Sequence, residues 1–262
     1  MTSFGDVTVE VGDDNVALVE IHRPPHNFFS LGMLSDLTDA VESVDADPDG
    51  RCILLATEGK NFCAGAELAR ENPKLTSEEA DGDAPHLYDY TVRLFAAGTP
   101  IVAAVQGAAV GGGLGLACMA DFRVGGPGTR MTANFARLGF HHGFGLSVSL
   151  PGIVGNQAAL ELLYTGRRID GATAGTLGLL DRLVDDDAEI RPTARALAAE
   201  IAGSAPLAVN SIRTTMRGHL PDAIRAATDR ERDEQERLRL TEDWKEGVAA
   251  MADRRPPQFS GR

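Results

Sequence analysis

Two glycine-rich segments carry backbone N–H groups that could hold an anionic oxygen. Residues 62–68 read Phe-Cys-Ala-Gly-Ala-Glu-Leu, and residues 107–116 contain three consecutive glycines. Each follows a short apolar run, and small residues at a strand-to-helix turn leave amides open to a ligand at the positive end of the helix. Either segment alone is more often explained by tight packing than by a site. Only their combination indicates a site.

A second group that could do chemistry is a pair of histidines in residues 139–145, Gly-Phe-His-His-Gly-Phe-Gly. An imidazole with an unperturbed pKa of about 6.5 can carry a proton at neutral pH, so His142, and less directly His141, are candidate acid/base groups. The alternative is structural: one histidine caps the following helix, and the other lies in a contact between subunits.

Strands and helices alternate around these segments. Residues 7–10 and 16–21 alternate apolar and polar side chains around a Gly-Asp-Asp-Asn turn, which predicts a β-hairpin. Ser30 is placed to cap a helix with apolar residues at helical spacing. The apolar runs 52–56 and 101–105 are typical of buried strands. The predicted fold class is therefore α/β.

Beyond residue 190 the strand signals stop, and the pattern predicts a core at 1–190 and a helical subdomain at 191–262. Helices are expected at residues 194–201, 206–217, 221–240 and 244–251. The mixed charges of residues 229–239 favour a solvated or intersubunit helix face. Residues 70–85 are polar and acidic, which favours an exposed excursion or lid.

Composition excludes several classes of protein. The formal net charge of −13 disfavours binding to nucleic acids or anionic membranes, because both require a basic face. The three cysteines are odd in number and lack metal-ligand spacing, so we expect neither a disulfide framework nor a metal site. No apolar run approaches the roughly 20 residues that span a bilayer. We expect a cytoplasmic protein without a membrane or nucleic-acid partner.

The two glycine-rich segments, in this order and about 45 residues apart, resemble the oxyanion-hole motifs of the crotonase (enoyl-CoA hydratase/isomerase) superfamily. By this resemblance the two amide donors are Ala66 and Gly112. The likeness continues in Arg23-Pro24 with Asn27, and in residues 121–123, 150–155, 162–166, 174–180 and 254–259. It implies a spiral of ββα units, a C-terminal trimerisation region in a homotrimer or dimer of trimers, and an acyl-CoA substrate. No tightly bound cofactor is expected, since coenzyme A arrives as part of the substrate.

The sequence departs from the hydratase pattern at two positions. Hydratases of the family resemble one another in two glutamates that handle water and its proton, and the corresponding residues here are Gly115 and Phe135. Neither can transfer a proton, so ordinary hydration is doubtful. His142 falls at or beside the place where other branches of the family, such as dehalogenases and naphthoate synthases, have a catalytic aspartate.

The resemblance also suggests contacts to the ligand. Ala64 and Phe135 are expected beside the acyl group. Arg23 and Lys60, near the first motif, and Arg255 and Phe259, in the tail, are expected to contact coenzyme A. Surface arginines are usually only solvated charges, which is the alternative for both arginines.

Two functions are compatible with these residues. The first is an enoyl-CoA hydratase/isomerase-family enzyme that stabilises the enolate of an acyl-CoA, in fatty-acid or related acyl-CoA metabolism, by isomerisation, decarboxylation or bond cleavage. The second is a catalytically silent acyl-CoA-binding or scaffold protein of the same fold. Turnover of any acyl-CoA would distinguish them.

Overall fold

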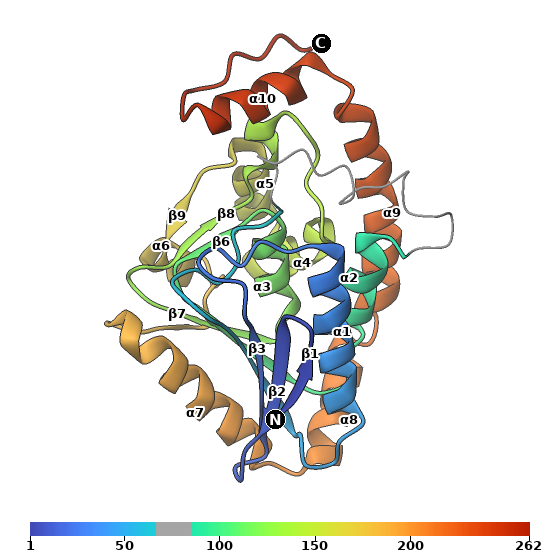
Figure 1. Cartoon of the computed structure of the whole chain (residues 1–262), viewed down its shortest axis with the longest axis vertical. Coiled ribbons are helices and arrows are strands. Elements are labelled where there is room, and N and C mark those ends of the chain that lie inside the picture. Colours follow the sequence, from blue (N-terminus) through green and yellow to red (C-terminus); the bar gives the residue numbers. More distant parts are fainter. Residues whose placement is uncertain (67–84) are drawn as a thin grey trace.

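The computed structural model describes residues 1–66 and 85–262, and it is built on a seven-stranded sheet (Figure 1). In spatial order the strands are β1 (Thr2–Phe4), β2 (Val7–Val11), β3 (Val16–Ile21), β4 (Cys52–Thr57), β5 (Ile101–Val105), β7 (Phe122–Gly125) and β10 (Arg182–Leu183). The first three strands pair antiparallel, and the strands from β3 onward pair parallel. The predicted hairpin and the two predicted buried strands are confirmed.

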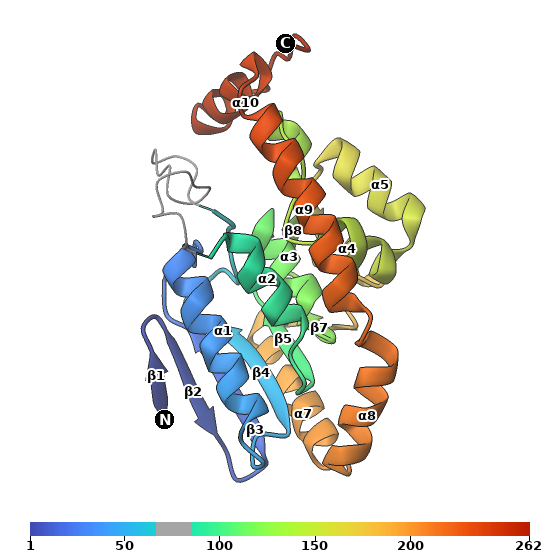
Figure 2. The ribbon, with the colours of Figure 1, turned by 90° about the vertical axis from the view of Figure 1, so that its right-hand side faces the viewer.

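Helices cover both faces of this sheet, as Figures 1 and 2 show. Helix α1 (Leu31–Asp45) packs on β2 and β3, and α7 (Ile190–Ala202) packs on the opposite face against β4, β5 and β7. Along β3 the side chains alternate: Ala17 and Val19 belong to the core beneath α1, and Val16 to the core beneath α7. As predicted, Ser30 caps α1, its side chain accepting a hydrogen bond from Met33 N at 3.2 Å. The α/β fold class is confirmed.

A smaller sheet carries the second glycine-rich segment, and an isolated bridge from Cys63 to Ala109 joins the first segment to it. The sheet pairs β6 (Ala108–Val110), β8 (Arg130–Thr132) and β9 (Ile169–Asp170). Helix α3 (Gly112–Met119) follows β6 and is buried along its whole length. The other helices of this part are a 3₁₀ turn (Asn134–Leu138), α4 (Leu146–Val154), α5 (Asn156–Thr165), α6 (Gly171–Thr176) and a 3₁₀ turn (Asp187–Glu189).

The chain ends in helices α8 (Pro206–Arg217), α9 (Leu220–Leu238) and α10 (Glu242–Ala252), close to the predicted limits. Helix α9 packs along α2 (Leu87–Phe95) and α4, as Figure 2 shows. No helix in the described part of the chain is long and apolar enough to cross a membrane. Nearly all of the predicted lid at 70–85 lies outside the described residues.

Candidate active site

The two glycine-rich turns lie side by side because their backbones are hydrogen-bonded. Cys63 N donates to Ala108 O at 2.9 Å, and Val110 N donates to Cys63 O at 3.0 Å. Gly65 has a φ of +84°, and a Cβ built on it would lie 2.6 Å from Val110 O and 3.8 Å from Gly112 N. Only glycine fits this crossing, since both the backbone conformation and the space exclude a side chain.

Ala66 and Gly112 line one cavity. Gly112 is the first residue of α3, so its N–H has no acceptor within the helix. Within residues 1–66 and 85–262, neither N–H donates a hydrogen bond. The α3 N-terminus adds partial positive charge beside them. We call Gly65, Ala66, Gly111 and Gly112 the amide wall.

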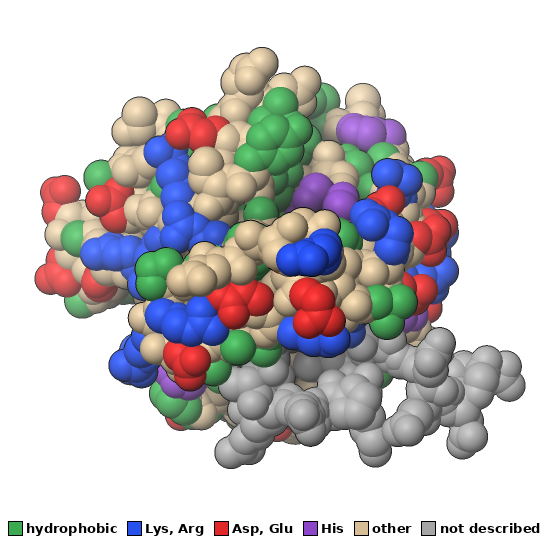
Figure 3. Space-filling model, turned by 90° about the horizontal axis from the view of Figure 1, so that it is seen from above, with side chains coloured by type: hydrophobic (Ala, Val, Ile, Leu, Met, Phe, Trp, Pro, Cys, Tyr) green, Lys and Arg blue, Asp and Glu red, His purple; other side chains and the backbone are tan. Residues whose placement is uncertain are grey.

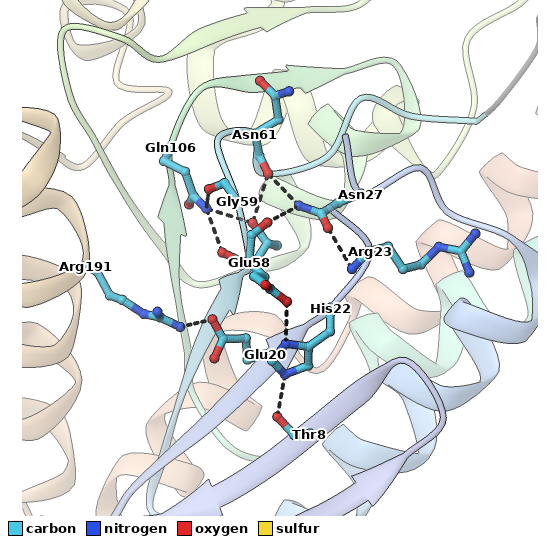
Figure 4. Close-up of polar contacts among 11 residues, drawn as sticks. Thr8, Glu20, His22, Arg23, Asn27, Glu58, Gly59, Asn61, Gln106 and Arg191 are labelled. Atoms are coloured by element: carbon cyan, nitrogen blue, oxygen red, sulfur yellow. Dashed lines mark hydrogen bonds and ion pairs between the residues drawn. The ribbon is translucent and has the colours of Figure 1, made fainter. Parts of the chain in front are cut away.

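Buried Asn27 supports the turn that carries Ala66 (Figure 4). Its side-chain amide donates to Glu58 O at 2.9 Å and Asn61 O at 2.7 Å, and its Oδ1 accepts from Arg23 N at 3.1 Å. Ala64 N in turn donates to His26 O at 2.9 Å. The contacts of Asn27 therefore hold together the segments that lead into the first amide donor.

The cavity has a volume of about 390 Å³. In the view from above, hydrophobic and histidine side chains lie together at a hollow of this face, with Lys and Arg side chains near it (Figure 3). Aromatic residues supply much of the apolar lining, namely Phe28, Phe29, Phe135, Phe140 and Phe144. Ala64 and Phe135 also line the cavity, and their contact with an acyl group stays a prediction.

Four side chains from α2 and the α9 region, His86, Tyr88, Gln235 and Arg239, form a polar side of the cavity that we call the donor wall. The Tyr88 hydroxyl donates to Gln235 Oε1 at 3.0 Å, and Gln235 Nε2 donates to His141 O at 2.9 Å. Burial raises the pKa of Tyr88, which keeps the phenol protonated at neutral pH.

His86 is the N-cap of α2, and both its side chain and its backbone N–H form hydrogen bonds. Its Nδ1 accepts from Tyr88 N at 3.1 Å, and its own N–H donates to Asp89 Oδ2 at 2.9 Å. Burial lowers the pKa of His86, Arg232 and Arg239 lower it further, and Asp89 opposes them. The ring is therefore neutral at pH 7, with its hydrogen on Nε2.

The positions expected to lack the hydratase glutamates are filled by aromatic packing. A Cβ built on Gly115 would lie 2.6 Å from Phe144 Cβ, so this ring occupies the space that a side chain at 115 would need. Phe144 is buried and has a φ of +62°, which is uncommon for a bulky residue. Neither position offers a carboxylate to the cavity.

His142 belongs to a polar chain behind the cavity. Its Nε2 lies 2.8 Å from Ser147 Oγ, and that hydroxyl donates to Glu231 Oε1 at 2.7 Å. Burial and then the charge of His141 lower the pKa of His142 to about 4. Burial raises the pKa of Glu231, which weakens this carboxylate as a counter-charge 4.0 Å away.

His141 and His142 stack with ring centroids 4.1 Å apart. In the described part of the chain neither residue lines the cavity, although Gly143 and Phe144, which follow them, do. Their acid/base role stays a prediction.

Of the residues expected to contact coenzyme A, Arg23 and Lys60 lie on turns that Asn27 joins by hydrogen bonds to Arg23 N, Glu58 O and Asn61 O. Arg23 donates to Asp6 Oδ2 at 2.5 Å and to Phe28 O at 3.0 Å. Arg255 forms a bidentate ion pair with Glu246 of α10, with Nη1–Oε1 and Nη2–Oε2 distances of 2.6 and 2.9 Å. Lys60 and Phe259 are exposed. The contacts of these four residues with coenzyme A stay predictions.

Gln235 and Arg239 were not predicted as site residues. The predicted solvated or intersubunit face at residues 229–239 is wrong for one side of this helix, because Glu231 is fully buried, and Gln235 and Arg239 line the cavity. Their spacing of four residues, continued from buried Ile224 and Thr228, was the signal that could have placed them inward.

Comparison with known proteins gives a consistent answer. The sequence model of the enoyl-CoA hydratase/isomerase family matches residues 12–262. A Bacillus subtilis protein named "Probable enoyl-CoA hydratase" is 32% identical over 249 residues, 95% of this chain and 96% of its own length.

Solved structures agree with the sequence match. An enoyl-CoA hydratase/isomerase from Pseudoalteromonas atlantica superposes with a TM-score of 0.85 and 26% identity, covering 97% of this chain and all of the other. Carnitinyl-CoA hydratase from Mycobacterium avium gives a TM-score of 0.81 and 27% identity over 98% of this chain and 99% of the other.

Proposed function

The chain belongs to the enoyl-CoA hydratase/isomerase family, and from this premise we propose that it is an enzyme acting on an acyl-CoA thioester. The observation that carries the proposal is the pair of amides, Ala66 N–H and Gly112 N–H, on one cavity without acceptors among the described residues. The thioester carbonyl oxygen would accept from both. The closeness of the two turns and the α3 N-terminus support this arrangement.

The chemistry follows from where negative charge develops. Removing a proton or a carbon substituent beside a thioester places charge on the carbonyl oxygen, and donors already fixed at that place stabilise the enolate without reorganising. Each such donor is worth about 2.7–4 kcal/mol in the transition state. Isomerisation, decarboxylation or bond cleavage is favoured over hydration, since neither Gly115 nor Phe135 can activate water.

Proton transfer has two sources in this proposal. His86 and Tyr88 line the cavity, so they have the shorter route to a bound acyl group. His142 is the residue predicted from the sequence; its Nε2 is engaged by Ser147, and it would act through its other nitrogen or after a shift of its loop. A neutral imidazole, which the low pKa of His142 ensures at pH 7, has the base form required.

The test is a panel of enoyl-, 3-hydroxyacyl-, malonyl- and β-ketoacyl-CoAs, with deuterium incorporation from D₂O into the α-carbon of a saturated acyl-CoA as a readout of enolate formation. We expect exchange or turnover with at least one member, and slow or no hydration of crotonyl-CoA. Rapid crotonyl-CoA hydration would overturn the reading of Gly115 and Phe135. Tight binding without exchange or turnover would favour the silent acyl-CoA-binding protein instead.

We also propose a homo-oligomer, as a trimer or a dimer of trimers. Helix α8 buries none of its side chains, and Leu207, Ile212 and Met216 expose 85%, 63% and 68% of their surface. Arg213 and Arg217 anchor the other side of α8 to Asp121, so the apolar side faces outward. Sedimentation of wild type and Ile212→Asp tests this: a smaller species is expected only for the variant. A wild-type monomer would contradict the proposal.

The cytoplasm is the proposed location, supported by three free and buried thiols, Cys52, Cys63 and Cys118.

A further inference from the structure

Helix α9 carries a fully buried carboxylate, Glu231, to which the proposed chemistry gives no role. We propose that Glu231 is a positioning residue for the acyl end of the site: it holds the turn at residues 143–147, and this turn sets Phe144 against the amide wall. The inference rests on the proposed function, because it places the acyl group on the face of Phe144. Three features carry it: the hydrogen bonds of the carboxylate, the conformation of the turn and the place of the Phe144 ring.

Three hydrogen bonds reach the Glu231 carboxylate from this one turn. Oε2 accepts from Gly145 N at 2.9 Å, and Oε1 accepts from Ser147 N at 3.1 Å and from Ser147 Oγ at 2.7 Å. Glu231 lies 86 and 84 residues beyond these partners, on α9, which packs along α4 (Figure 2). Within the described residues its ion-pair partner is His142 at 4.0 Å, whose pKa of about 4 leaves the ring neutral at pH 7. The carboxylate is therefore held by donors of the turn rather than by a cation.

These donors belong to the N-terminal end of α4. Gly145 is the N-cap of this helix, and as a glycine it has no side chain that could cap it. Glu231 supplies the missing acceptor from another helix, where the first N–H groups have no partner of their own and the helix dipole favours an anion. Burial raises the pKa of Glu231, and the donors of Ser147 and Gly145 oppose that shift. An apolar residue in its place would leave these N–H groups unpaired.

The turn needs such a hold because its backbone conformation is unfavourable. Phe144 and Gly145 have φ angles of +62° and +70°, so two consecutive residues are left-handed, and one of them is bulky. A residue other than glycine keeps this conformation only where its surroundings enforce it. Glu231 binds the first and the third residue after Phe144, and it therefore restrains the turn directly beside the unfavourable residue.

The Phe144 ring lies between this turn and the amide wall. Its centroid is 5.8 Å from that of Phe29, whose N–H donates to Gly65 O at 3.1 Å. A Cβ built on Gly112 would lie 3.6 Å from Phe144 Cδ2, so the ring reaches the N-terminus of α3. Phe144 also lines the cavity. With the thioester on the amide wall, the acyl group meets this ring, and a shift of the turn would move the surface that the acyl group contacts.

Ser147 extends the same hold to His142. The hydroxyl of Ser147 has one hydrogen, which it donates to Glu231 Oε1, because an ionised carboxylate can only accept. The Ser147 Oγ must then accept from His142 Nε2, 2.8 Å away. The neutral His142 ring therefore carries its hydrogen on Nε2 and its lone pair on Nδ1. This tautomer is a spectroscopic signature of an ionised Glu231 that holds the turn.

The experiment compares Glu231→Gln with wild type by titration calorimetry at pH 7, using butyryl-, hexanoyl- and octanoyl-CoA and free coenzyme A. The amide keeps the shape of the side chain but sets an NH₂ group against an N–H of the turn, so the turn shifts. We expect the tightest acyl-CoA to bind about 4- to 15-fold more weakly, the equivalent of one or two methylene groups losing their apolar contact, and free coenzyme A to bind as in wild type. Asp233→Asn is the matched control, because it makes the same carboxylate-to-amide change at an exposed position of α9, and it should leave both affinities unchanged.

Nitrogen-15 NMR of the histidine rings gives a second readout. The ring signals of His142, assigned by their loss in His142→Gln, should show the hydrogen on Nε2 in wild type at pH 7. Ser147→Ala removes the hydrogen bond that selects this tautomer, so the two nitrogen shifts should move closer together. A hydrogen on Nδ1 in wild type would mean that Ser147 donates to His142 and not to Glu231, and it would overturn the inference.

The outcomes separate this inference from the proposed function. If Glu231→Gln weakens acyl-CoA and free coenzyme A equally, or weakens neither, Glu231 does not position the acyl surface, and the inference is wrong while the proposed acyl-CoA site stands. If wild type binds no acyl-CoA, both fail. The tautomer of His142 in wild type decides the inference if Glu231→Gln does not fold.

Discussion

The amide wall and the donor wall enclose the same cavity but are made in different ways. The amide wall uses backbone N–H groups from two turns that are neighbours through direct hydrogen bonds between Cys63 and the β6 strand. The donor wall uses side chains, and its central hydrogen bond joins Tyr88 to Gln235, 147 residues away along the chain.

Because of this difference, substitutions affect the two walls differently. Backbone donors keep their positions whatever the neighbouring side chains are, so the amide wall suits the group that we propose is common to all substrates, the thioester. Side-chain donors change with single substitutions, so the donor wall is the side of the cavity that single substitutions can alter most easily. The predictions below test whether the two walls are as independent as their construction indicates.

The largest effect is expected from removing one donor of the amide wall. Gly112→Pro deletes the N–H, and proline is tolerated at the first position of a helix. A Cβ at 112 would lie 2.4 Å from Phe29 Cζ, so the change is made in a Phe29→Leu background, which is also the control. Relative to that control, the rate of enolate exchange or turnover should fall about 10²- to 10³-fold. A fall of less than about threefold would show that this amide is not a donor.

The loop that carries His142 should make the free energy of unfolding depend on pH. The pKa of His142 is about 4 in the folded protein against 6.5 for the free side chain, so the unfolded state binds its proton first as the pH falls. The free energy of unfolding should therefore decrease from pH 6.5 to pH 4, by about 3 kcal/mol from this residue. Urea denaturation of wild type and His142→Gln measures the difference in slope, which isolates His142 from the carboxylates. Parallel slopes would contradict the prediction.

A third test concerns the closed space at position 115. Gly115→Ala should destabilise the protein by about 1–3 kcal/mol, because the added methyl meets Phe144 Cβ in a filled core. Gly152→Ala is the matched helical control: a Cβ there meets nothing within 4 Å, so a small stabilisation of about 0.5–1 kcal/mol is expected. Thermal denaturation of both variants and of wild type measures these changes in stability. If Gly115→Ala were as stable as wild type, position 115 would have room for a side chain, and the amide wall would be less enclosed than described.

The smallest effect is expected at the donor wall itself. Tyr88→Phe removes the hydrogen bond to Gln235 Oε1 and should lower the free energy of unfolding by about 1 kcal/mol. Tyr164→Phe, at a tyrosine that is 74% exposed, serves as the control and should have no measurable effect. If Tyr88→Phe left the free energy of unfolding unchanged, this hydrogen bond would not stabilise the donor wall.

Much of the fold could be predicted because its signals are local. The turn of the first hairpin, the Ser30 cap and the apolar runs of β4 and β5 each depend on neighbours within a few residues, and all are found in the structure. The same holds for Ala66 and Gly112, because the glycines and small residues around them can be recognised in the sequence.

The sequence by itself thus determined the α/β class, the two amide-bearing turns and the absence of a carboxylate at Gly115 and Phe135. Only the tertiary structure decided that Phe144 fills the space at 115, that His142 points to Ser147, and that Gln235 and Arg239 face the cavity. The physical reason is the distance along the chain over which each feature is determined. A backbone turn is determined by its own residues. The direction of a side chain on α9 is determined by packing against α2 and α4, which are distant in sequence.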